Sequence, residues 1–208
     1  MAKQILHREL FDFDRELRKT YSLICGVDEA GRGPLAGDVY AAAVILNDDV
    51  EIVGLNDSKK LSEKKREELF DVIIEKADAY CIATASVKEI DELNILQATM
   101  LAMKRAVEGL SIKPEYAMID GNKIPSLNCK SDYLIKGDAK SASVAAASVL
   151  AKVARDRYMK KKAEEYPQYV FDKHKGYGTK LHYEKLLEYG PSEVHRMTFL
   201  KKLYNEEK

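Results

Sequence analysis

The sequence has no tryptophan, only 5 prolines and only 3 cysteines in 208 residues. It also contains no run of 18 apolar residues, which excludes a membrane-spanning helix, and no N-terminal apolar stretch of signal-peptide length. Hydrophobic residues make up 46% of the chain and charged residues 33%, a balance that excludes disordered, collagen-like and low-complexity proteins. The sequence therefore predicts a soluble globular protein that is not exported.

The three cysteines, Cys25, Cys81 and Cys129, are odd in number and far apart in the chain. They form no Cys-x-x-Cys pattern and no Cys/His pair at zinc-ligand spacing. Disulfides are rare in reducing compartments, so this usage predicts free thiols and a cytoplasmic location.

Net charge is zero, because 34 basic residues balance 34 acidic ones. The balance differs along the chain, with 18 basic and 24 acidic residues in 1–135 but 16 and 10 in 136–208. Such a gradient suits a protein that grips a polyanion and holds metal ions where an acidic pocket meets a basic rim. Solvated helix faces explain the same numbers equally well.

Chain length predicts one domain. A chain of 208 residues can bury roughly 70% of its unfolded surface, so it needs no metal or disulfide to stabilise its core. We therefore expect a single catalytic domain over 1–208, with a helical N-terminal extension over 1–20 and a helical C-terminal region from about 168 to 208. Any metal in it is expected to be functional.

Hydrophobic periodicity predicts interleaved strands and helices. The predicted strands cover 22–27, 39–46, 80–87, 116–120 and 133–135. The predicted helices cover 5–18, 62–78 and 89–110, with one that opens at 137–141 and stops at Pro167 and one that ends at Tyr189. This order predicts an α/β fold, a mixed sheet covered by helices.

Four acidic residues follow predicted strands. Asp28 and Glu29 come after the first, Asp120 after the strand over 116–120, and Asp138 after the strand over 133–135. Ligands of open α/β sheets bind outside the carboxyl ends of strands, and carboxylates gathered there repel one another unless they share protons or cations. Oxygen ligands favour Mg²⁺ or Mn²⁺.

Two such ions about 4 Å apart can activate a water and stabilise the leaving oxygen of a phosphodiester, so no nucleophilic side chain is needed. The sequence indeed has no G-x-S-x-G, no H-E-x-x-H and no G-x-x-x-x-G-K-[ST]. The glycines after Glu29 are spaced G-x-G-x-x-x-G, which argues against a dinucleotide site. Each acid alone also has a structural explanation: Asp138 as a helix N-cap, and Asp28 and Asp120 as turn residues.

Six segments, in order, resemble the motifs of ribonuclease HII. They are V-D-E-A-G-R-G-P-L-A-G at 27–37, D-S-K-K-L at 57–61, N-I-L-Q-A-T at 94–99, I-D-G at 119–121, K-G-D-A at 136–139 and H-K-G-Y-G-T at 174–179. The resemblance runs from about residue 22 to 198. It implies a ribonuclease H-like sheet and an endonuclease that cleaves RNA paired with DNA and nicks 5′ of ribonucleotides embedded in duplex DNA, leaving 3′-hydroxyl and 5′-phosphate ends.

The resemblance also implies roles for particular residues. Asp28, Glu29, Asp120 and Asp138 match the four catalytic acids that hold Mn²⁺ or Mg²⁺, with two ions expected when substrate is bound. The segment Gly31, Arg32 and Gly33 matches the loop that recognises the ribose 2′-hydroxyl, and Tyr177 matches the tyrosine that contacts the sugar on the DNA side of the junction. Glycines suit this role because they let the backbone approach a sugar closely. Without the resemblance, Arg32 would be interpreted as a surface ion pair and Tyr177 as core.

Lysines near these motifs are candidate phosphate contacts, Lys59 foremost, with Lys60, Lys140 and Lys175. The sequence departs from the family's usual pattern at Asp38, which adds a carboxylate near the predicted pocket, and at Cys25, where a small residue such as alanine is usual. His174 and His195 lack metal-ligand spacing and are expected to be structural or minor substrate contacts.

Two rival interpretations remain. The ribonuclease HIII type shares the acids but usually carries an extra N-terminal domain and a different loop after the Asp-Glu pair. A non-catalytic module that binds hybrids is the other, and the four intact acids argue against it. The expected partners are RNA/DNA hybrids and duplex DNA containing ribonucleotides, bound by a monomer. The tail 197–204 lacks the glutamine-led motif of replication-clamp ligands, so a helix packed on its own domain is expected there.

Overall fold

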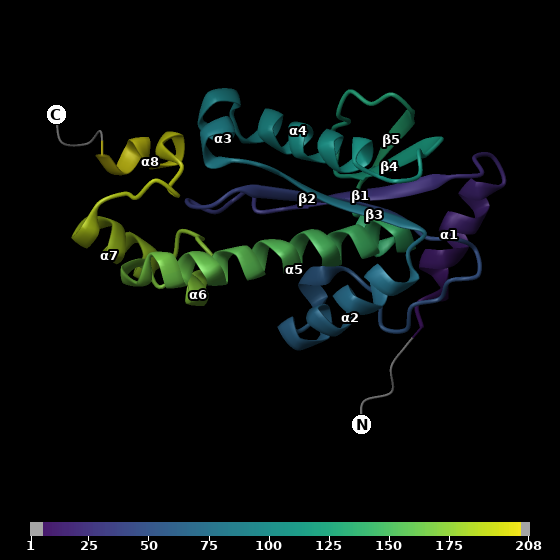
Figure 1. The fold of residues 1–208 in the computed structure, drawn as a ribbon, viewed down its shortest axis with the longest axis horizontal. Coiled ribbons are helices and arrows are strands. Elements are labelled where there is room, and N and C mark those ends of the chain that lie inside the picture. Colours follow the sequence, from purple (N-terminus) through teal and green to yellow (C-terminus); the bar gives the residue numbers. More distant parts are fainter. Residues whose placement is uncertain (1–5, 205–208) are drawn as a thin grey trace.

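The computed structural model describes residues 6–204, and a five-stranded mixed sheet forms its centre (Figure 1). The strand order is β3-β2-β1-β4-β5. The strands are β1 (Ile24–Ala30), β2 (Val39–Ile45), β3 (Ala79–Ala85), β4 (Tyr116–Asp120) and β5 (Lys130–Leu134). The predicted α/β class is confirmed.

The central strand β1 determines where the site forms. It pairs antiparallel with β2, placing Asp28 opposite Ala42, and parallel with β4, placing Val27 opposite Ile119. Strand β5 is in turn parallel to β4. The carboxyl ends of β1, β4 and β5 therefore lie at one edge of the sheet, where ligands of α/β folds bind.

Helices cover both faces of the sheet (Figure 1). On one face lie α3 (Val87–Leu93) and α4 (Ile95–Glu108), and on the other α1 (Arg8–Arg18), α2 (Glu63–Lys76) and α5 (Ala142–Glu165). Two apolar clusters separate these layers: one joins α1, α2 and α5 to β2, and the other joins α4 to β1, β2 and β4. The short 3₁₀ turns are η1 (Ser58–Lys60), η2 (Gly137–Ala139) and η3 (Pro167–Tyr169).

Helix α5 packs unusually close to β1 because the facing residues are small. A Cβ added at Gly26 would lie 2.1 Å from the Ser143 carbonyl carbon and 2.2 Å from the Val144 nitrogen. The first turns of α5 are rich in alanine, and they are buried. This contact places the middle of α5 beside the end of β1, next to the site described below.

Several predicted boundaries are wrong, including that of the strand predicted over 133–135, which is observed as β5 (Lys130–Leu134). Strand β1 runs on to Ala30, so Asp28 and Glu29 lie within it rather than after it. The predicted helix over 89–110 is two helices, because Asn94 has a φ of 72° and breaks the chain direction. The Asn94 side chain accepts hydrogen bonds from the N–H groups of Leu96 and Gln97 and so caps α4.

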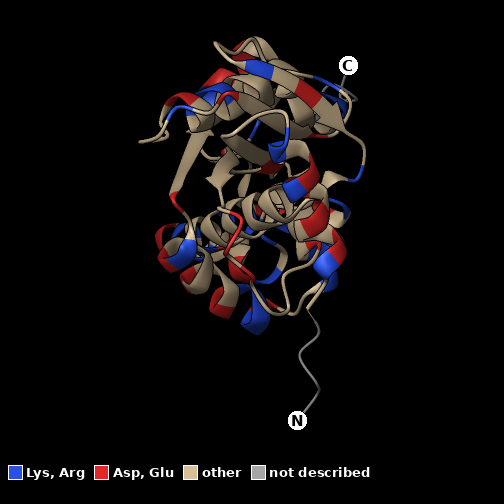
Figure 2. Cartoon of the chain, turned by 90° about the vertical axis from the view of Figure 1, so that its right-hand side faces the viewer, with Lys and Arg blue, Asp and Glu red and all other residues tan. Residues whose placement is uncertain are grey.

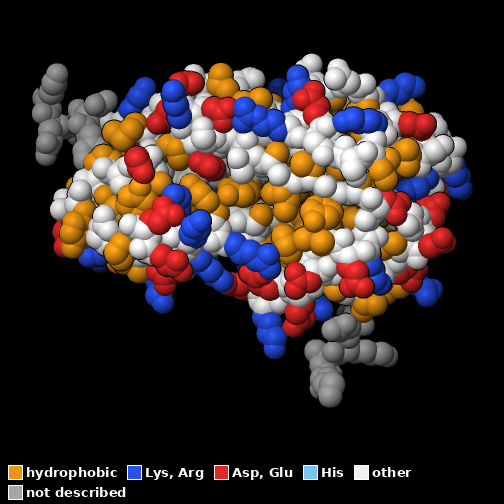
Figure 3. Space-filling model, viewed as in Figure 1, with side chains coloured by type: hydrophobic (Ala, Val, Ile, Leu, Met, Phe, Trp, Pro, Cys, Tyr) orange, Lys and Arg blue, Asp and Glu red, His pale blue; other side chains and the backbone are white. Residues whose placement is uncertain are grey.

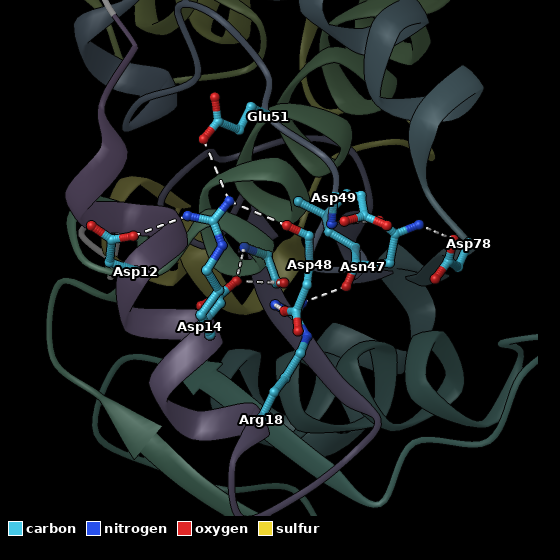
Figure 4. A network of polar contacts seen from close by, with 11 residues as sticks. Asp12, Asp14, Arg18, Asn47, Asp48, Asp49, Glu51 and Asp78 are labelled. Atoms are coloured by element: carbon cyan, nitrogen blue, oxygen red, sulfur yellow. Dashed lines mark hydrogen bonds and ion pairs between the residues drawn. The ribbon is translucent and has the colours of Figure 1, made fainter.

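The N-terminal helix α1 is attached by polar contacts (Figure 4). Arg18 donates to the Asp48 carboxylate at 2.9 Å, and Arg15 bridges Asp12 and Glu51. Asp14 is buried, and its Oδ2 accepts from the backbone N–H and hydroxyl of Ser143 at the start of α5. Burial raises the pKa of the Asp14 carboxyl.

The C-terminal part is helical, as predicted, with α6 (Phe171–His174), α7 (Lys180–Tyr189) and α8 (Met197–Tyr204) following η3. Leu200 of α8 is buried and clusters with Leu35 and Leu186, so the predicted tail helix on its own domain is confirmed. Basic and acidic residues are interspersed along the ribbon in Figure 2, and their side chains are mixed on the face drawn in Figure 3. Between residues 6 and 204, every helix is too short or too polar to cross a bilayer.

Candidate active site

Three acidic side chains converge at the carboxyl edge of the sheet. Asp28 comes from β1, Asp120 is the last residue of β4 and Asp138 lies in η2. Each offers an oxygen, and these oxygens all lie within 4.8 Å of one another. The fourth predicted acid, Glu29, lines a cavity together with Asp28 but is outside this group. Its Oε1 lies 3.7 Å from Nη1 of Arg32.

Local structure explains how these acids are held. Asp120 Oδ1 accepts a 2.7 Å hydrogen bond from the backbone N–H of Gly137, which ties the end of β4 to η2. Asp138 is not the N-cap of the following helix, because the Ser141 side chain caps α5 by accepting from Val144 N–H. The carboxylate of Asp138 is thus free of a capping role. Its Oδ2 lies 3.8 Å from the Lys59 ammonium.

Burial and mutual repulsion make this cluster favour protons or cations. Burial raises the pKa of Asp28 well above its usual value, and the charges of Glu29 and Asp120 raise it further. The pKa values of Asp138 and Glu29 are also raised, again first by burial and then by the neighbouring Asp120 carboxylate, although Arg32 and Lys59 oppose the shift. A divalent cation would remove the cost of the crowded charges.

The donor set fits a hard cation. Asp28, Asp120 and Asp138 supply only carboxylate oxygens, the ligands preferred by Mg²⁺ and Mn²⁺. No histidine or cysteine of the described chain belongs to the group. The acids on three separate segments would therefore hold the ion at the edge of the sheet.

A cavity of about 210 Å³ opens beside the acids. Its walls are formed by β1 and the glycine-rich loop that follows, by η1, by one face of α5, and by the loop before α7. The lining residues are Asp28, Glu29, Ala30, Gly31, Arg32, Gly33, Ser58, Lys59, Ser148, Lys152, Arg155 and Tyr177. The predicted acidic pocket with basic neighbours is present here.

The glycine-rich loop needs its first glycine. Gly31 has a φ of +100°, and a Cβ there would lie 2.1 Å from Nε of Arg155. At Gly33 a Cβ would find only the Tyr177 ring within 4 Å, at 3.7 Å. The loop thus approaches the tyrosine that the sequence assigned to sugar contact.

Tyr177 lies at the mouth of the cavity and not in the core. Its side chain is 43% exposed, and the guanidinium carbon of Arg155 lies 5.9 Å from its ring centroid. The ring is therefore partly exposed beside the glycine-rich loop, and the Arg155 guanidinium lies next to it. An exposed aromatic face of this kind can pack against a deoxyribose.

Sequence reasoning missed three cavity residues. Ser148, Lys152 and Arg155 lie on one face of α5 because they are spaced i, i+4, i+7. Polar residues at that spacing in an otherwise alanine-rich segment could have indicated a polar face of this helix. Among the predicted phosphate contacts, Lys59 lines the cavity, whereas the described lining includes none of Lys60, Lys140 and Lys175.

The two departures from the family pattern lie outside the acid cluster. Asp38 Oδ1 accepts a 3.0 Å hydrogen bond from Val87 N–H at the start of α3. Asp38 is near the cavity, because its backbone carbonyl accepts from Arg155, but it does not line the cavity. Cys25 is fully buried in the β1 core. His174 and His195 are buried, in keeping with a structural role.

Comparison with known proteins identifies the relatives of this chain. Residues 25–202 match the family model described as ribonuclease HII. The chain is 54% identical over 187 residues to a ribonuclease HII of Caldicellulosiruptor saccharolyticus, covering 90% of this chain and 91% of that protein. It is also similar to the crystal structure of ribonuclease H2 from Pyrococcus horikoshii, with a TM-score of 0.71 and 28% identity over 88% of this chain and 98% of the other. A complex of PCNA with ribonuclease HII from Archaeoglobus fulgidus gives a TM-score of 0.67 at 26% identity, covering 84% of this chain and 94% of that one.

Proposed function

The chain belongs to the ribonuclease HII family, and we propose that it performs that family's reaction in the cavity between the three converging acids and Tyr177. It is a metal-dependent endoribonuclease that cleaves the RNA strand of RNA/DNA hybrids and cuts at ribonucleotides embedded in duplex DNA. The ribonuclease HIII alternative loses its support because the family model matched is that of ribonuclease HII. The observation that carries the site is the convergence of Asp28, Asp120 and Asp138.

We assign catalysis to Asp28, Glu29, Asp120 and Asp138. The first, third and fourth hold the divalent cation, and Glu29 stands beside them at the cavity wall. When bound, one or two Mg²⁺ or Mn²⁺ ions supply Lewis-acid activation of water and stabilisation of the leaving oxygen. Lys59 lies 3.8 Å from Asp138 and is placed to contact a backbone phosphate.

Substrate selection is assigned to the cavity rim. Gly31, Arg32 and Gly33 offer an uncrowded backbone that can reach a 2′-hydroxyl, the group that distinguishes RNA from DNA. Tyr177 faces this loop and would pack against the neighbouring deoxyribose, where an added hydroxyl would be crowded. Together they place the cut 5′ of a ribonucleotide that precedes DNA.

The test is nicking of a DNA duplex that contains one ribonucleotide, with Mg²⁺ or Mn²⁺, followed by identification of the ends. We expect a single nick 5′ of the ribonucleotide with 3′-hydroxyl and 5′-phosphate ends. Cyclic phosphate ends would contradict activation of water by a metal ion. Binding of the duplex without any cut product would favour the non-catalytic module.

Several expectations stay predictions: the single domain over 1–208 with its extensions, a monomeric state, and a cytoplasmic location that the three free cysteines favour. A clamp partner is recorded for the Archaeoglobus relative, whose structure is a complex with PCNA. In this chain, Leu200 of α8 is occupied by packing against its own domain.

A further inference from the structure

Arg196 is enclosed by the glycine-rich loop. The residue precedes α8, is fully buried, and donates all five of its guanidinium N–H groups to backbone carbonyls of that loop. Nε donates to Gly37 O at 2.9 Å; Nη1 donates to Arg32 O at 3.0 Å and Pro34 O at 2.8 Å; Nη2 donates to Gly31 O and Gly37 O, both at 2.6 Å. The loop from 31 to 37 is thus folded around one cation.

This cation has no carboxylate partner. In the described chain, all hydrogen-bond acceptors of Arg196 are peptide carbonyls, and Arg196 forms no ion pair with an Asp or Glu. Burial, and then the nearby Arg155, lower the pKa of Arg196 to about 9, which leaves the guanidinium charged at neutral pH. Its direct partners are therefore peptide dipoles, which are held pointing at it, and the carboxylates of Asp38 and Asp91 act on its charge only from a longer distance.

The orientation of those dipoles determines where the loop N–H groups point. In a trans peptide, the carbonyl and the next residue's N–H point in opposite directions. Because the carbonyls of Gly31 and Arg32 point at Arg196, the N–H groups of Arg32 and Gly33 point away from it. Both of these residues are exposed, line the cavity, and in the described chain neither N–H has a hydrogen-bond acceptor.

A third peptide of the loop confirms this polarity. The Pro34 carbonyl points at Arg196, and the N–H of Leu35 in the same peptide donates to Gly176 O at 2.8 Å. Gly176 immediately precedes Tyr177. The side of the loop that faces away from Arg196 is therefore the side that faces the tyrosine segment.

We propose that Arg196 is a positioning residue for ribonucleotide recognition. Its buried charge orients and polarises the peptides at 31–32 and 32–33, so that the N–H groups of Arg32 and Gly33 donate to the 2′-oxygen of the ribonucleotide. The inference rests on the proposed function of the Gly31–Gly33 loop and adds the residue that holds this loop in place. Arg196 itself touches no substrate.

The test measures binding in an Asp120→Asn background, where cleavage is absent. The quantity is the ratio of the dissociation constants for an all-DNA duplex and for the same duplex with one ribonucleotide. Arg196→Lys keeps the charge but offers three donors rather than a five-donor fork, and Arg196→Gln removes the charge. We expect each substitution to reduce the ratio about tenfold while leaving all-DNA binding nearly unchanged.

Ile73→Val is the matched control, because it loosens a buried residue of α2 that lies outside the cavity and the loop. It should lower thermal stability and leave the ratio unchanged. An unchanged ratio in both folded Arg196 variants would overturn the proposal. If instead the Asp120→Asn parent itself shows no preference for the ribonucleotide, the proposed function fails.

A measurement on the unaltered Arg196 protein covers the case in which the variants do not fold. Amide proton shifts of Arg32 and Gly33 are followed by NMR during titration of Asp120→Asn with each duplex. We expect both amide protons to move downfield only with the ribonucleotide duplex. Equal shifts with both duplexes, or none with either, would overturn the proposal.

Discussion

The acid cluster and the proposed recognition rim, formed by Gly31–Gly33 and Tyr177, lie side by side yet are built on opposite principles. Asp28, Asp120 and Asp138 are negative groups held by strand ends and a 3₁₀ turn, and they are destabilised by one another. The rim, by contrast, is held by buried cations: Arg155 and Arg196 donate to backbone carbonyls around Gly31 and Tyr177. The acid cluster would need a cation from solution to neutralise its charges, whereas the rim is held by two cations of the protein itself, Arg155 and Arg196.

Under the proposed function, this difference separates the residues for cleavage from the residues for recognition. The cluster stores electrostatic repulsion that protonation relieves at low pH and a metal ion would relieve at neutral pH. The carbonyls of Gly31, Arg32 and Pro34 are hydrogen-bonded to Arg196 in the protein alone, so the rim is organised before substrate arrives. Substitutions in the two regions should therefore affect different measured quantities.

The largest expected effect is loss of cleavage in Asp120→Asn. The amide oxygen can still accept from Gly137 N–H, but one negative ligand is removed, so turnover should fall by a factor on the order of 10³ or more while duplex binding persists. Asp132→Asn, an exposed carboxylate on the adjacent strand β5, is the control. Single-turnover nicking rates measure both, and wild-type turnover by Asp120→Asn would refute the ligand assignment.

Tyr177→Ala should affect recognition more than hybrid cleavage. Loss of the exposed ring removes a sugar contact worth about tenfold, so nicking at a single ribonucleotide should slow by about that factor relative to cleavage of a continuous RNA/DNA hybrid. Tyr80→Ala, 39% exposed on β3 against 43% for Tyr177, is the matched control. Equal slowing on both substrates would show that the ring does not contribute to selection.

Metal addition should stabilise the acid cluster selectively. The raised pKa values of Asp28 and Asp138 mean that stability is greatest when they are protonated at low pH and is lost as pH rises through their folded-state values. Mn²⁺ should therefore raise the melting temperature more at pH 7.5 than at pH 5. At a concentration 100 times its Kd, the ion adds about 2.7 kcal/mol to the free energy of unfolding. An equal rise in Asp120→Asn would contradict binding at this site.

The histidines next to the Tyr177 backbone should give a pH dependence of the opposite sign. His182 Nδ1 donates to Tyr177 O, so its Nε2 must accept from His195 Nε2 at 3.0 Å, and His195 Nδ1 accepts from Ser192 N–H. Both rings must be neutral. Burial lowers the pKa of each to about 4.

These histidines should stabilise the fold above pH 6.5, their unfolded value, and lose that contribution as pH falls toward 4. His195→Gln should therefore be less stable than wild type at pH 7, and the gap should shrink by up to about 1.4 kcal/mol per pH unit on acidification. Denaturant titrations at several pH values measure the gap. A gap that does not change with pH would disprove this account.

Strand and helix positions could be predicted wherever the hydrophobic pattern was regular. The strand over 116–120 and the Ser62 cap were predicted at their observed positions. The break at Asn94 was missed because a helical pattern continues through it, and only the positive φ of that residue interrupts the chain. The extent of β1 was missed because its last residues are acidic and were interpreted as a loop.

By itself, the sequence predicted the family and a metal-dependent hydrolysis, because the acids at predicted strand ends and the glycine-rich loop lie within segments that resemble ribonuclease HII motifs. Only the tertiary structure decided that oxygens of three of the four acids lie within 4.8 Å of one another and that Asp38 is not part of this group. It alone also revealed Arg196, whose partners are backbone carbonyls. Every residue carries such a carbonyl, so no pattern of side chains marks the loop that folds around this cation.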